Sequence, residues 1–106
     1  MRTFPESLAK FQQIVNERGE GLRTLSFEEL RRMVNQSAQQ HISVESRPAT
    51  ISVIVQPQPD GGLRVVVQGF MKARYLPGKH VAIDGFYKHP DGTVTPMDSG
   101  EFYEFD

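Results

Sequence analysis

The side chain with the clearest chemical potential in this sequence is Asp84, which lies between Ile83 and Gly85 in an apolar segment. Desolvation can raise the pKa of such a carboxylate, which can then act as a general base. An aspartate that pairs with a nearby cation is more often a structural ion pair, and Lys72 and Arg74 are the cations available on adjacent strands. Asp84 is therefore the one candidate catalytic residue, and both interpretations stay open.

The three histidines, His41, His80 and His89, show no short spacing typical of metal ligands. His80 lies four residues before Asp84, which is roughly 13 Å along a strand and too far for a direct dyad. The chain has no cysteine, so disulfides, thiolate nucleophiles and zinc–thiolate sites are excluded. We expect no metal and no cofactor, and the sequence favours a protein that is not an enzyme.

The charges of the second half are unevenly placed. Five cations and only one acid, Asp84, lie between Gly62 and Pro90, whereas the segment from Asp91 onward has five acids and no base. Cations that alternate with aromatic rings on a sheet can hold phosphates and stack bases. The net charge of −1 and the lack of an RNP-like motif argue against nucleic acid, which stays an alternative. The five cations are Arg64, Lys72, Arg74, Lys79 and Lys88.

Two amphipathic helices are predicted in the first 40 residues, over about 3–18 and 26–38. Thr3 with Glu6, and Ser26 with Glu29, have the spacing of capping boxes, and apolar residues follow each at helical intervals. Gly19 and Gly21 are expected to end the first helix. The polar stretch 35–41 is interpreted as a frayed continuation or a connector.

The second half predicts an antiparallel meander of four or five strands over about 49–97. Apolar residues alternate along 51–55 and 63–68, and turn residues follow at 57–62 and 89–92. If Val55 lies opposite Leu63, one face of this pair carries six apolar side chains and packs under the helices. Gly69 is interpreted as a bulge, and 101–105 as a short strand or a turn. The six are Ile51, Val53, Val55, Leu63, Val65 and Val67.

The fold class is therefore α+β, with two N-terminal amphipathic helices packed on one face of the sheet. Helices followed by an antiparallel meander resemble the layout of cystatin-like and NTF2-like folds, which host unrelated functions. The cystatin loop motif has no match, because Val67-Gln-Gly69 lies inside a predicted strand rather than in a hairpin loop. No functional residue is therefore carried over from either fold.

Length and composition are those of an ordinary globular protein. A chain of 106 residues with 38% hydrophobic and 24% charged residues predicts a single domain over 1–106. There is no run of 18 apolar residues and no stretch typical of a signal peptide. We expect a soluble cytoplasmic protein with no membrane partner.

The leading functional hypothesis is a non-catalytic binding domain that engages a protein partner, or a second copy, through the exposed face of its sheet. Ile54, Val66 and Phe86 would make that face more apolar than a solvated one. An enzyme or small-ligand pocket, with Asp84 as base and Tyr87 or Tyr75 as hydrogen-bond donor, is the alternative. Partner contacts are predicted at the tip of the hairpin 72–79, at Lys72, Arg74, Tyr75, Leu76 and Lys79.

Overall fold

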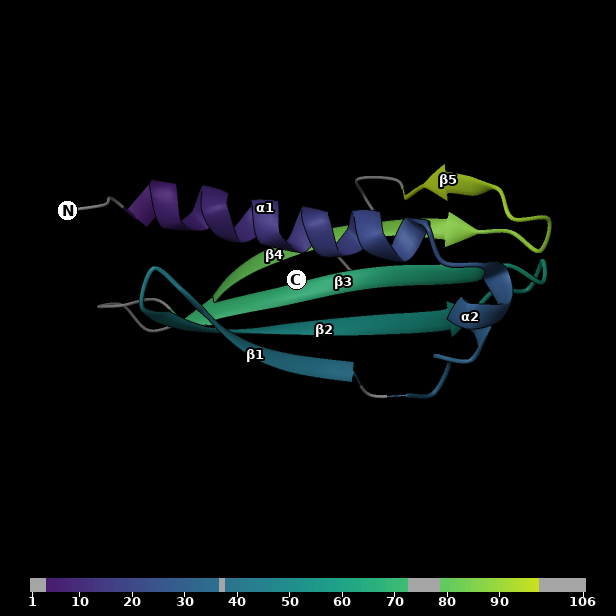
Figure 1. Cartoon of the computed structure of the whole chain (residues 1–106), viewed down its shortest axis with the longest axis horizontal. Coiled ribbons are helices and arrows are strands. Elements are labelled where there is room, and N and C mark those ends of the chain that lie inside the picture. Colours follow the sequence, from purple (N-terminus) through teal and green to yellow (C-terminus); the bar gives the residue numbers. More distant parts are fainter. Residues whose placement is uncertain (1–3, 37, 73–78, 98–106) are drawn as a thin grey trace.

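Five antiparallel strands form one meander sheet, and a long helix lies along one face of it (Figure 1). The computed structural model describes residues 4–36, 38–72 and 79–97. The predicted α+β class and antiparallel sheet are confirmed, and the two-helix prediction is confirmed only in part. The elements are α1 (Phe4–Arg23), α2 (Phe27–Arg31), β1 (Ala38–Val44), β2 (Arg47–Pro57), β3 (Leu63–Lys72), β4 (Lys79–Lys88) and β5 (Val94–Pro96).

The first helix is longer than predicted. It passes through Gly19 and Gly21 and ends at Arg23, so the expectation that these glycines end it is wrong. A glycine inside a helix costs about 1 kcal/mol relative to alanine. The helix tolerates two because its apolar stripe continues to Leu22, which is buried in the core with Phe11 and Val15.

The second helix is a single short turn rather than a helix to residue 38. Ser26 caps it as predicted, because the Ser26 hydroxyl accepts the backbone N–H of Glu29 at 3.1 Å. The helix then ends at Arg31, and Asn35 adopts a left-handed φ of 66°. Its main contribution to the core is Leu30, which is fully buried.

The first strand of the sheet was not predicted. The sheet begins at Ala38 rather than near 49, because part of the polar stretch 35–41 belongs to β1. β1 pairs with β2 through a two-residue turn in which Glu45 and Ser46 both have positive φ, 52° and 67°. This is the geometry of a type I′ hairpin, which usually contains Asn-Gly. Glu-Ser gives no such signal in the sequence.

The face of the β2–β3 pair was predicted correctly, but its register was wrong by two residues. Val55 lies opposite Val65, and Pro57 lies opposite Leu63, because β2 runs two residues further than expected. A shift of two keeps every side chain on its face, so all six predicted residues are in the core. Pro57 fits β2 because pairing with β1 stops at Val53.

The turns after β2 and β4 share one construction. Each has Pro-Asp-Gly at its tip, and Gly61 and Gly92 adopt positive φ of 89° and 93°. In each turn the aspartate Oδ1 accepts a backbone N–H two residues on, from Gly62 for Asp60 and from Thr93 for Asp91, both at 2.9 Å. Both predicted turn positions are therefore confirmed.

Close approach of α1 to the sheet depends on Gly69. It pairs regularly with Ile51 and Ala82, so the predicted bulge is absent. A Cβ at this position would lie 2.6 Å from Cζ of Phe11 and 3.0 Å from Cγ2 of Val15. The glycine thus makes room for the aromatic ring that seats α1 on the sheet.

Within residues 4–36, 38–72 and 79–97, no helix is long and apolar enough to cross a membrane. The predicted strand or turn at 101–105 lies outside the described residues.

Candidate functional site

Asp84, the candidate catalytic residue, is held in an ion pair with Arg23. Nη1 of Arg23 donates to Oδ2 of Asp84 at 2.7 Å, and Nη2 donates to Oδ1 at 3.0 Å. This bidentate geometry is the strongest that a carboxylate and a guanidinium form. For a structural ion pair at Asp84, the sequence predicted that Lys72 or Arg74 would supply the cation. The cation comes instead from the last turn of α1.

The ion pair is packed between the helix and the sheet. The guanidinium lies 4.9 Å from the centre of the Phe86 ring, a cation–π distance, and hydrogen bonding to Asp84 raises the pKa of Arg23 above its ordinary value. A Cβ at Gly19 would overlap Oδ2 of Asp84 and lie 2.9 Å from its Cγ. Gly19 therefore allows the carboxylate to approach the helix backbone.

Two side chains of α1, one from its middle and one from its last turn, cover part of one edge of the sheet. β5 pairs with β4 only from Phe86 to Lys88, so earlier carbonyls of β4 have no strand beside them among the described residues. Gln12 Nε2 donates to the Ile83 carbonyl at 3.1 Å, and Arg23 Nη2 donates to the Gly85 carbonyl at 3.3 Å. These hydrogen bonds attach the helix to the edge of the sheet.

The predicted basic surface is divided between two faces of the sheet. Lys88 is buried on the helix side, where its Nζ donates to the backbone carbonyl of Arg23 at 3.3 Å. A cation at the end of a helix interacts favourably with the helix dipole. Arg64 lies on the opposite face and donates to the Gln56 side chain at 2.6 Å and 3.0 Å. These two cations therefore do not form one patch.

The predicted partner-binding hairpin is only partly described. Lys72 and Lys79 pair at the ends of β3 and β4, whereas Arg74, Tyr75 and Leu76 lie outside the described residues. The prediction that partner contacts gather there stays a prediction.

The histidines lie apart from one another. His89 Nε2 is 3.0 Å from the Thr95 hydroxyl, and His41 is exposed on β1. In the described part of the chain no three His, Cys, Asp or Glu residues gather as metal ligands would.

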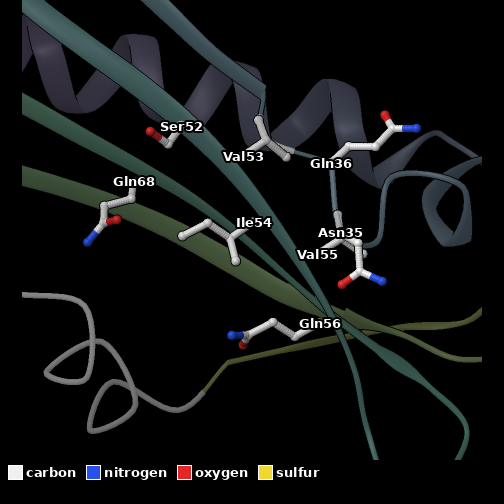
Figure 2. Close-up of a pocket in the computed structure, with 8 residues that line it drawn as sticks. All are labelled: Asn35, Gln36, Ser52, Val53, Ile54, Val55, Gln56 and Gln68. Carbon is white, nitrogen blue, oxygen red and sulfur yellow. The ribbon is translucent and has the colours of Figure 1, made fainter.

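A groove, which sequence reasoning missed, lies beside β2 where β1 begins (Figure 2). Pairing between β1 and β2 stops at Val53, and β2 continues to Pro57 with no described strand on that side. Ile54 and Gln56 lie in the groove, with Asn35 and Gln36 on one side and Gln68 on the other. Its volume is about 440 Å³.

Backbone groups at the open stretch of β2 are part of this groove. Gln58 N–H donates to the Gly62 carbonyl at 2.9 Å and closes the β2–β3 hairpin. Hydrogen-bonded and non-hydrogen-bonded pairs alternate in an antiparallel ladder. Gln56 and Ile54 therefore bond to β3, and the N–H and C=O of Val55 point toward the open side.

The outer face of the sheet, opposite the helices, carries apolar side chains beside the polar ones that line the groove. Val66 lies on this face and is fully buried, and Ile54 and Ile83 are half-buried. Met97 packs on Gly85, where a Cβ would overlap its Sδ. Phe86, expected on this face, points instead toward α1 and is fully buried. The alternation of β4 places Phe86 and Asp84 on the same side.

Two signals in the sequence could have led to these sites. A glycine inside an amphipathic helix, as at Gly19, indicates close approach of another group. The stretch Gln39–Ser43 contains a β-branched residue, Ile42, near a possible turn, which indicates a strand beside β2. Neither signal indicates that Arg23 meets Asp84, which are 61 residues apart.

No protein-family model, curated protein or solved structure matches this chain. The likeness to cystatin-like and NTF2-like layouts is therefore one of element order alone.

Proposed function

We propose that this protein is a non-catalytic binding domain that takes an extended segment of a protein partner into the groove beside β2. The observation that carries the proposal is the open stretch of β2 after Val53, with the Val55 N–H and C=O directed into the groove. An extended peptide that joins a sheet edge gains main-chain hydrogen bonds there, and neighbouring side chains supply the specificity.

The lining of the groove suits such a segment. Asn35 and Gln36 provide amides that both donate and accept hydrogen bonds, and Ile54 provides an apolar contact. Gln56 provides its NH2 group as a donor, because its Oε1 already accepts from Arg64. None of these four side chains is charged, which favours an uncharged peptide segment over a strongly acidic or basic one. The segment would continue the line of β1 along the edge of β2.

A random library of displayed linear peptides tests this proposal. Ile54→Asp should abolish binding of selected peptides, because it replaces the apolar contact in the groove with a carboxylate that a bound uncharged peptide would have to desolvate. Val94→Asp, at an exposed apolar position of β5, is the matched control and should bind as the original protein does. Selected peptides that bind equally well to both variants, or failure to select any peptide, would contradict the proposal.

The enzymatic alternative rests on Asp84 and has less support. Its carboxylate accepts two hydrogen bonds from Arg23, and Asp84 lines neither the groove beside β2 nor the smaller one beside Tyr87 and His89. A general base needs access to a substrate proton. The nucleic-acid alternative is likewise weakened by the burial of Lys88.

A further inference from the structure

The two edges of the sheet differ in which other described residues lie against them. At the β4 edge lie a three-residue strand ending in Pro96 and the side chains of Gln12 and Arg23, which occupy carbonyls of β4. Short edge strands, proline and covering elements are the devices that prevent further strands from joining a sheet. At the β1 edge, none of these devices is found among residues 4–36, 38–72 and 79–97.

The β1 edge has a free set of backbone groups. The two-residue turn at Glu45 and Ser46 makes Val44 and Arg47 a hydrogen-bonded pair. Because hydrogen-bonded and non-hydrogen-bonded pairs alternate, the backbone N–H and C=O groups of Gln40 and Ile42 point toward β2. Those of Gln39, His41 and Ser43 point outward, away from the sheet. Among residues 4–36, 38–72 and 79–97, no strand pairs with this outward side.

We propose that a second copy of this chain pairs along this edge, β1 against β1, around a two-fold axis at His41. The outward residues are symmetric about His41, so His41 faces the partner's His41, and Gln39 faces the partner's Ser43. Each outward residue exchanges both its N–H and its C=O, which gives six hydrogen bonds. The product is one continuous ten-stranded sheet.

Charge and closure favour a second copy over a foreign strand. The strand Ala-Gln-Gln-His-Ile-Ser-Val contains no Lys, Arg, Asp or Glu, so two copies meet without repulsion between such groups. A charged segment finds no complementary side chain there. A two-fold contact uses the same edge in both copies and therefore closes, and the three-residue β5 with its proline disfavours further strands at the opposite edge. The proposal goes beyond the proposed function, since it uses the edge of β1 and not the groove.

The expected dimer is weak. Two paired strands of seven residues bury less than the roughly 1,200 Å² typical of stable complexes. Sedimentation velocity should therefore detect self-association at protein concentrations of roughly 0.1–1 mM and not at low micromolar concentrations.

A charge exchange at the two-fold axis tests the register. In His41→Lys and in His41→Glu, like charges face each other, and each variant alone should dimerise at least about tenfold more weakly. An equimolar mixture of the two should restore dimers, because lysine then faces glutamate. His41 is exposed, so both variants should keep the fold and its melting temperature. Gln13→Lys and Gln13→Glu, on the exposed face of α1, are the matched controls and should dimerise normally.

Amide hydrogen exchange gives a second readout. The N–H groups of Gln39, His41 and Ser43 should gain protection as concentration rises, whereas those of Gln40 and Ile42 should be protected throughout. A protein that stays monomeric at roughly 1 mM would overturn the proposal. So would single variants that still dimerise, or a mixture that stays monomeric. A foreign protein that protects the same three amides, without any self-association, would also overturn it.

Discussion

Two glycines of α1, two residues apart, should respond in opposite directions to the same substitution. Alanine normally stabilises a helix interior by about 0.5–1 kcal/mol relative to glycine. At Gly21 no other atom lies within 4 Å of the added Cβ, so Gly21→Ala should raise the free energy of unfolding by about that amount. At Gly19 the same Cβ overlaps the Asp84 carboxylate, which must move away from Arg23.

The size of the Gly19 effect follows from the exposure of the ion pair. Exposed pairs contribute about 0–1 kcal/mol, and breaking a buried pair costs about 3–5 kcal/mol. The side chains of Arg23 and Asp84 are 23% and 18% exposed, which places the loss between these limits, at about 2–3 kcal/mol. After the helix gain, Gly19→Ala should destabilise the protein by about 1–2 kcal/mol and lower the melting temperature by about 5–15 °C.

Urea denaturation at 25 °C measures both variants, and Asp84→Ala supplies the control. With the carboxylate removed, the Gly19 Cβ meets only Nη1 of Arg23, at 3.0 Å, which is the end of a flexible side chain and can move. Gly19→Ala should then stabilise the protein as Gly21→Ala does. Equal stabilisation by the two glycine substitutions in the original protein would refute the reasoning. So would a Gly19→Ala variant that still destabilises in the Asp84→Ala background.

Three further predictions concern the core, the helix end and a turn. Gly69→Ala should destabilise the protein by about 2 kcal/mol in urea denaturation, because the new methyl group overpacks the core against Phe11, and Phe11→Leu should recover part of this loss. Lys88→Met keeps the buried chain but removes its charge near the Arg23 carbonyl, and should cost about 0.5–1 kcal/mol by the same measurement; no loss would contradict a role at the helix end. Hydrogen bonds from the Thr93 hydroxyl and backbone N–H hold the Asp91 pKa below its ordinary value. The stabilisation that the Asp91 carboxylate contributes is therefore present above the unfolded-state pKa and is lost as pH falls below about 4. In carboxyl titrations by NMR, Thr93→Val should raise the Asp91 pKa, and an unchanged titration midpoint would contradict the assignment.

The sequence was sufficient for the fold class because the alternation of β2 and β3 and the stripe of α1 are strong signals. It was insufficient for β1, whose polar side chains and Glu-Ser turn resemble a connector. The register was wrong because Pro57 was taken to end β2, although proline is tolerated where its nitrogen faces a side of the strand that has no paired neighbour. The contact of Arg23 with Asp84 depends on how α1 packs against β4, and the groove beside β2 depends on where its pairing with β1 stops. No local pattern contains that information.

Exchange of the Val55 amide tests the central claim most directly. In the free protein the Val55 N–H should exchange faster than those of Ile54 and Gln56, which bond to β3. Addition of a peptide selected for the groove should slow exchange at Val55 and leave Ile54 and Gln56 unchanged. A Val55 amide that is already protected in the free protein, or that is unaffected by a bound peptide, would contradict the account.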